Sequence, residues 1–216
     1  MIRLMNVSKT YRANNVRKTV LDDVSAVFDT RHAYGILGLN GAGKSTLLRI
    51  VAGTEPADRG RVYRGASLSW PMAFGGGFHS GMTGRENLNF VANIYGVSSR
   101  YVTDFVIDFA ELGAYIDAPV GTYSSGMQAR LAFGMSMAIE FDFYLIDEIT
   151  AVGDERFGAR CNKALMERRQ RSGLMLVSHS VGSIKTLCDR AAILKDGKLT
   201  LFDDVDTAIE IYRKTF

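Results

Sequence analysis

Residues 38–45 have the sequence Gly38-Leu39-Asn40-Gly41-Ala42-Gly43-Lys44-Ser45. The spacing of Gly, four residues and then Gly-Lys-Ser is typical of a loop that binds phosphate. A short apolar run at 33–37 precedes the loop, and helical periodicity over 45–52, ending at Gly53, follows it. This order of strand, glycine loop and helix is the context that the motif requires. The alternative is a glycine turn that only caps a helix.

The residue types in this loop suit a nucleoside triphosphate. Glycines let consecutive backbone N–H groups curl around phosphates, and the helix N-terminus adds partial positive charge. We expect Lys44 to reach the β- and γ-phosphates and the Ser45 hydroxyl to ligate Mg²⁺. The nucleotide-binding candidates in this part of the chain are Gly38, Asn40, Gly41, Ala42, Gly43, Lys44, Ser45 and Thr46.

Polar side chains follow two later apolar runs. Asp147 and Glu148 come directly after the run at 143–146, and His179 comes two residues after the run at 174–177. Parallel sheets bind ligands at the carboxyl ends of their strands. We therefore expect Asp147 to hold Mg²⁺, Glu148 to polarise the attacking water, and His179 to contact the γ-phosphate. Taken alone, the acidic pair could be a helix cap and the histidine could be structural.

A second helix N-terminus is predicted where Ser124, Ser125 and Gly126 precede the helical pattern at 128–140. Hydroxyls and bare amides at such a position can bind an anion. The alternative is a plain N-cap with Ser125 as the capping side chain. These residues by themselves do not decide between the two.

The rest of the chain indicates an α/β protein with an inserted helical region. Helical spacing at 85–95, 100–112 and 128–140 interrupts the strand pattern, which then returns at 143–146 and 174–177 with a helix at 158–169 between. Strands that alternate with helices indicate a parallel sheet. The end of the chain predicts a hairpin turning at Asp196-Gly197 and then a helix at 205–213.

Composition excludes several classes of function. The 216 residues are 47% hydrophobic and carry a net charge of +3, too small and too dispersed to indicate nucleic-acid binding. The sequence predicts no membrane-spanning helix and no secretion signal, so we expect the chain in the cytosol. Cys161 and Cys188 have no partner at metal-ligand spacing, so we expect buried free thiols.

Together these motifs resemble the ATP-binding subunit of ABC transporters, over nearly the whole chain and in the same order. The likeness implies an ATPase with a mixed sheet whose core strands are mainly parallel, plus an inserted α-helical subdomain. By resemblance, 38–45 is the phosphate loop, 124–127 the signature loop, and His179 the switch histidine. Tyr11 resembles the aromatic residue that stacks on adenine; the alternative is a tyrosine that only ends a strand.

The resemblance also implies an organisation and a set of partners. Residues 1–77 and 141–216 would form a RecA-like core with N-terminal antiparallel strands, and 78–140 a helical subdomain. Two copies would pack head to tail, so that the signature loop of one completes the ATP site of the other. A separate transmembrane permease subunit would dock on the helical subdomain and on Trp70 to Arg85, at the cytoplasmic side of the bacterial inner membrane.

Finer features resemble one subfamily, the exporters of capsular and O-antigen polysaccharides. The segments that carry this likeness are 123–127, 83–87 and 151–154. The capsular branch fits better, because some O-antigen relatives append a carbohydrate-binding domain and this chain stops soon after the predicted helix at 205–213. We expect further capsule-export machinery among its partners. One departure is that no glutamine precedes Thr83 where ABC proteins usually carry one; His79 is a candidate replacement.

Other classes remain as alternatives. Export of O-antigen, teichoic acid or another cargo is the main rival, and a P-loop small-molecule kinase is the rival among enzymes. The kinase would leave the signature loop and His179 unexplained. A GTPase would need Asn-Lys-x-Asp, whereas Asn162-Lys163 continues with Ala164-Leu165.

Overall fold

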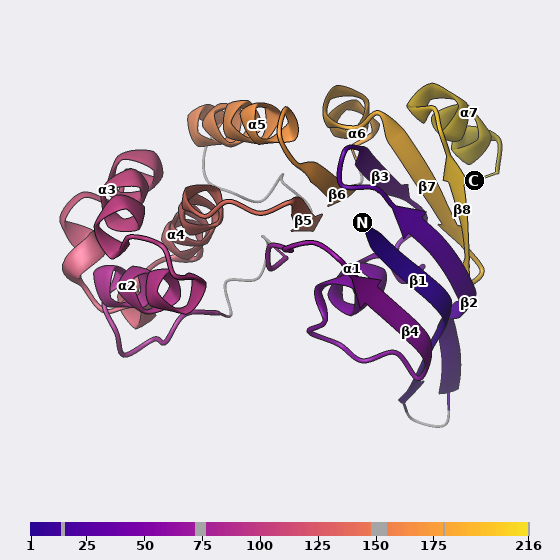
Figure 1. Ribbon diagram of the computed structural model, residues 1–216, viewed down its shortest axis with the longest axis horizontal. Coiled ribbons are helices and arrows are strands. Elements are labelled where there is room, and N and C mark those ends of the chain that lie inside the picture. The colour runs from indigo at the N-terminus through magenta and orange to yellow at the C-terminus, as the bar shows by residue number, and fades with distance from the viewer. Residues whose placement is uncertain (14–15, 72–76, 148–154, 179, 216) are drawn as a thin grey trace. The chain divides into compact units, whose positions relative to one another are not determined.

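The computed structural model describes residues 1–13, 16–71, 77–147, 155–178 and 180–215. Their contacts divide them into two compact units (Figure 1). Unit 1 contains the described residues within Met1–Pro71, Phe141–Glu148 and Arg168–Phe216. Unit 2 contains those within Met72–Glu140 and Ile149–Glu167.

Unit 1 contains a five-stranded mixed sheet. Its four parallel strands and one antiparallel edge strand have the order β5-β6-β3-β7-β8, with bounds Phe143–Asp147, Gly173–Val177, Ala33–Leu37, Arg190–Lys195 and Lys198–Phe202. β3 and β6 are buried along their whole length, as expected for central strands of a parallel sheet that is covered on both faces. The predicted mixed sheet with a parallel core is confirmed.

A second, antiparallel sheet is formed by β1 (Ile2–Ala13), β2 (Val16–Phe28) and β4 (Arg59–Arg64), in the order β2-β1-β4. The sequence pattern did not predict β4, because five of its six residues are exposed. Its position is fixed by pairing with β1 and by Arg64, whose guanidinium donates to the carbonyls of Val51 and Ile50.

Helix α1 (Lys44–Ala52) lies in the core that both sheets share. Leu47 and Leu48 are fully buried in one cluster with Ile2 and Leu4 of β1 and with Met175 of β6. Helices α6 (Val181–Leu187) and α7 (Val205–Thr215) complete unit 1. Seven residues give α6 too short a periodicity to be predicted from sequence.

Unit 2 is helical. Its helices have the bounds Gly84–Tyr95 for α2, Ser99–Ala110 for α3, Ser125–Ala138 for α4 and Glu155–Arg169 for α5, whose last two residues group with unit 1. Two short 3₁₀ turns, Gly113–Asp117 and Val120–Thr122, connect α3 to α4. A capping box between Thr83 and Glu86 sets the start of α2. The predicted helical insertion is confirmed.

The two cysteines are buried and free, as the sequence predicted. Burial raises the pKa of Cys161 and that of Cys188 to about 12. Because the thiolate is the reactive form, both thiols are inert at neutral pH. Among the described residues, no helix is long and apolar enough to cross a membrane.

Candidate functional site

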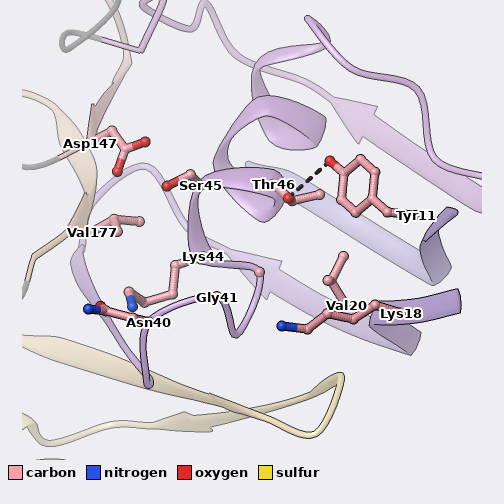
Figure 2. A pocket seen from close by; sticks show the side chains of 11 residues that line it. Tyr11, Lys18, Val20, Asn40, Gly41, Lys44, Ser45, Thr46, Asp147 and Val177 are labelled. Atoms are coloured by element: carbon pink, nitrogen blue, oxygen red, sulfur yellow. Dashed lines mark hydrogen bonds between the residues drawn. The ribbon is translucent and has the colours of Figure 1, made fainter. Parts of the chain in front are cut away.

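A cavity of about 480 Å³ opens at the N-terminus of α1 (Figure 2). Every residue that lines it belongs to unit 1, and the lining is Tyr11, Lys18, Val20, Asn40, Gly41, Gly43, Lys44, Ser45, Thr46, Asp147 and Val177. Of the expected nucleotide-binding residues in unit 1, Gly38 and Ala42 do not line it. Ala42 packs against the core, and Gly38 lies close to the backbone of Leu194.

Two glycines of the loop are required by close approach and by backbone conformation. A Cβ on Gly38 would lie 2.5 Å from the carbonyl oxygen of Leu194, and one on Gly43 would lie 2.9 Å from Val20. Gly43 is the N-cap of α1, with φ 108°, and contributes no side-chain cap. The first N–H groups of α1 are therefore not capped by a side chain of their own N-cap residue, which suits them to an anion from outside.

Lys44 places a positive charge inside this loop. The residue is 6% exposed, and its ammonium donates to the carbonyl oxygens of Gly38 at 2.7 Å and Leu39 at 3.0 Å. A buried ammonium is tolerated because hydrogen bonds replace its hydration. The cavity thus combines an uncapped helix N-terminus with a fixed cation, and phosphate groups complement both.

Ser45 and Asp147 contribute oxygen atoms on the same side of the cavity. Asp147 ends β5 and Ser45 lies in the first turn of α1; in Figure 2 the hydroxyl points toward the carboxylate. Hard oxygen ligands of this kind suit Mg²⁺, which keeps waters and substrate phosphates in its remaining positions. No group of three or more His, Cys, Asp or Glu side chains with metal-site geometry occurs in the described part of the chain. The hydroxyl of Ser45 and the carboxylate of Asp147 are the described side-chain groups that would suit Mg²⁺ at this cavity.

Tyr11 is held by a network that the sequence did not predict. Its hydroxyl donates to Glu55 at 2.6 Å and lies 3.1 Å from the hydroxyl of Thr46. Arg49 donates to Glu55 at 2.9 Å and to Tyr11 at 3.3 Å. Burial raises the pKa of Glu55, but hydrogen bonds from Tyr11, Arg49 and Lys9 outweigh it and lower that pKa below its usual range. The ring is thus fixed at its hydroxyl end while it lines the cavity.

Lys18 and Val20 of β2 also line the cavity, although the sequence did not single them out. A Cβ on Gly41 would lie 3.2 Å from the Lys18 ammonium. The alternation of side chains along a strand could have identified Lys18 and Val20 together, because residues two apart on a strand share a face. Lys18 brings a second cation to the site.

The predicted second helix N-terminus lies in unit 2, at the start of α4. The capping residue is Ser124 rather than Ser125, because the Ser124 hydroxyl accepts from the N–H of Met127 at 3.2 Å. Ser124 and Ser125 are exposed, and a Cβ on Gly126 would meet only the Ser124 hydroxyl, at 3.9 Å. The structure thus corrects the identity of the cap and leaves this N-terminus open to solvent.

Several expected residues cannot be placed. Glu148 and His179 lie outside the described residues, as does the part of the 70–85 segment at 72–76. His79 is described and exposed. Its backbone N–H donates to Asn87, whose amide in turn donates to the carbonyl of His79, so the backbone there is anchored to α2.

The parallel sheet, the glycine loop between β3 and α1, and the cation and carboxylate beside it define the class of P-loop nucleoside triphosphatases. A sequence model of the ABC transporter family matches residues 21–151. The chain is 47% identical to the ATP-binding protein BexA of Haemophilus influenzae, covering 100% of this chain and 99% of that protein. It is 48% identical to the capsule polysaccharide export ATP-binding protein CtrD of Neisseria meningitidis, covering 98% of each.

Among solved structures, the fold matches the dimeric ATP-binding cassette MJ0796, described in a post-hydrolysis state bound to ADP and Pi. The TM-score is 0.78 at 21% identity, over 92% of this chain and 96% of that one. The chain belongs to the ABC transporter family, as one of its ATP-binding subunits. The resemblance found in the sequence motifs is therefore confirmed, as is the ATPase class.

Proposed function

We propose that this chain hydrolyses ATP to power export of a capsular polysaccharide across the bacterial inner membrane. The cargo assignment rests on full-length similarity to CtrD, a capsule polysaccharide export ATP-binding protein. The chain would act as a homodimer at the cytoplasmic side of that membrane, on a separate permease subunit and with further capsule-export machinery. Dimerisation is supported by the dimeric form of the MJ0796 cassette.

Within this proposal the residues of the cavity divide the work on ATP. Lys44 and the N–H groups at the start of α1 bind the β- and γ-phosphates, and the Tyr11 ring packs on adenine. Ser45 and Asp147 would hold Mg²⁺, which when bound supplies charge neutralisation for the phosphates. Glu148 positions and polarises the attacking water, and His179 contacts the γ-phosphate; both roles rest on sequence motif alone. The lining of the cavity is completed by Asn40, Gly41 and Thr46.

The start of α4 would act on the ATP held by the other copy of the chain. Ser124, Ser125 and Gly126 present hydroxyls and amides at an exposed helix N-terminus, a place that favours anions. Residues 78–140, which group within unit 2, would serve as the helical subdomain, and together with Trp70 to Arg85 they would form the permease-docking surface. His79 is our candidate for the missing glutamine.

One variant tests the enzymatic part of this proposal. Glu148→Gln should bind ATP, hydrolyse it at least about 10²-fold more slowly than the unaltered chain, and accumulate as an ATP-bound dimer in size-exclusion chromatography. Full turnover with a monomeric elution would contradict the roles of Glu148 and of the dimer.

The identity of the cargo is tested by a separate experiment. Deletion of the gene should abolish one surface glycan, and a plasmid encoding the chain should restore it while Lys44→Ala should not. If O-antigen rather than capsule disappears, the assignment of capsular polysaccharide as the cargo is wrong, whereas the ATPase assignment stands. Photocrosslinking from His79 or Met82 to the permease tests the docking surface.

A further inference from the structure

The β2-β1-β4 sheet has a second hollow on the face opposite the nucleotide cavity. Tyr11 and Lys18 are paired in register and line the nucleotide cavity. Their neighbours, the pairs Thr10 with Thr19 and Arg12 with Arg17, therefore face the other way. The hollow measures about 530 Å³, larger than the nucleotide cavity, and its lining includes Thr10, Arg12, Arg17, Thr19, Asp58 and Arg59.

The three arginines of this hollow make an unbalanced cluster of positive charge. Arg12 and Arg17 lie directly opposite each other across the strands, an arrangement that destabilises a sheet. Among the residues that the structure describes, Arg12, Arg17 and Arg59 form no ion pair and donate to no carboxylate. All three are exposed, so their guanidinium groups are free to converge on a ligand.

The two acidic residues of the hollow are already engaged elsewhere. Asp58 accepts the N–H of Thr10 at 2.7 Å and lies 3.4 Å from the ammonium of Lys9. Asp22 lies 2.9 Å from the ammonium of Lys198. Each carboxylate therefore has a lysine partner outside the hollow, with Lys9 shared between Asp58 and Glu55. The lining itself has three arginines against these two carboxylates, which gives the hollow a net positive potential.

We propose that this hollow binds a soluble polyanion that carries closely spaced phosphate or carboxylate groups. Guanidinium forks bind both kinds of oxyanion in bidentate fashion, and a cavity of this size accommodates a small molecule. The hydroxyls of Thr10 and Thr19, which lie 3.0 Å apart in the lining, add polar contacts. A ligand here offsets the repulsion between Arg12 and Arg17. The site does not depend on the proposed cargo or on ATP hydrolysis.

Calorimetric titration with inorganic pyrophosphate and, separately, with citrate tests the site and distinguishes phosphate from carboxylate ligands. The titrations use the full chain carrying Lys44→Ala in magnesium-free buffer, so that the nucleotide cavity contributes little. Adding Arg12→Gln, Arg17→Gln and Arg59→Gln should raise the Kd of at least one probe about tenfold or more. The matched control is Arg61→Gln, an exposed arginine of β4 outside the hollow, which should change Kd by less than about twofold.

Thermal unfolding separates loss of the site from loss of the fold. The triple glutamine variant should melt no lower than its parent, because removing like charges that face each other relieves repulsion. Pyrophosphate or citrate should raise the Tm of the parent and of the Arg61→Gln control, but not that of the triple variant. The proposal would be overturned if each probe bound with the same Kd to the parent, the Arg61→Gln control and the triple variant. It would also be overturned if the parent bound neither probe.

Discussion

The chain has two helix N-termini that its sequence marks as anion sites, at α1 in unit 1 and at α4 in unit 2, and they are built differently. At α1 the N-cap is Gly43, which offers no side chain, and the buried Lys44 ammonium adds a full charge. At α4 the N-cap is Ser124, whose hydroxyl already accepts the N–H of Met127, and the first turn has no lysine.

This difference separates a site that can bind an anion alone from one that, in the proposed dimer, completes the site of the other copy. The first has a walled cavity, a buried cation and the side-chain oxygens of Ser45 and Asp147; the second is a capped, exposed helix end. A helix N-terminus alone contributes about 0.3–1 kcal/mol toward an anion when exposed. The start of α4 therefore binds an anion too weakly to hold a nucleotide by itself. In the proposed dimer it would contact a nucleotide that the cavity of the other copy already holds.

The largest expected effect is at Lys44. Lys44→Ala should lower ATP hydrolysis by about 10²-fold or more, because it removes a fixed charge from the position of the transferred phosphoryl group. Lys18→Ala is the matched control, a lysine of the same cavity that is exposed. It should raise KM by no more than about fivefold and leave kcat unchanged. Steady-state phosphate release measures both, and equal losses would show that burial does not distinguish the two lysines.

Effects of intermediate size are expected for two glycine variants, one at each of the two helix N-termini. Gly38→Ala should destabilise the fold by about 1–3 kcal/mol and weaken ATP binding, since its Cβ would lie 2.5 Å from the Leu194 carbonyl oxygen. Gly126→Ala meets no such obstacle and should stabilise α4 by about 0.5 kcal/mol. It should nevertheless lower hydrolysis about tenfold or more, because the added methyl group faces the partner's phosphate in the proposed dimer.

Denaturant unfolding and ATPase assays on both glycine variants separate effects on stability from effects on activity. For Gly126→Ala, activity should fall while the free energy of unfolding holds or rises. If its activity matches the unaltered chain, the start of α4 takes no part in catalysis. If Gly38→Ala unfolds at the same denaturant concentration as the unaltered chain, the close approach to Leu194 is not a constraint.

Local patterns sufficed for the parts of the fold and site that depend on neighbours in sequence. The phosphate loop, the strands around it and the cavity residues Lys44, Ser45 and Asp147 follow from spacing and alternation. The anchoring of Tyr11 by Glu55 joins residues 44 positions apart, so no local pattern encodes it. Likewise β4 is recognisable only through its pairing with β1, because its exposed arginines give no apolar alternation.

The smallest expected effect separates capping from catalysis at α4. Ser124→Ala removes the side chain that accepts the Met127 N–H and should cost about 1 kcal/mol of unfolding free energy. Ser125→Ala is the matched control, since Ser125 is not the cap, and should change stability by less than about 0.5 kcal/mol. If Ser124 serves only as a cap, Ser124→Gly should restore stability to within a few tenths of a kcal/mol and restore hydrolysis with it. If its hydroxyl also binds the partner's phosphate, Ser124→Gly should recover stability without activity, and that uncoupling would show that one hydroxyl serves both the helix and the dimer.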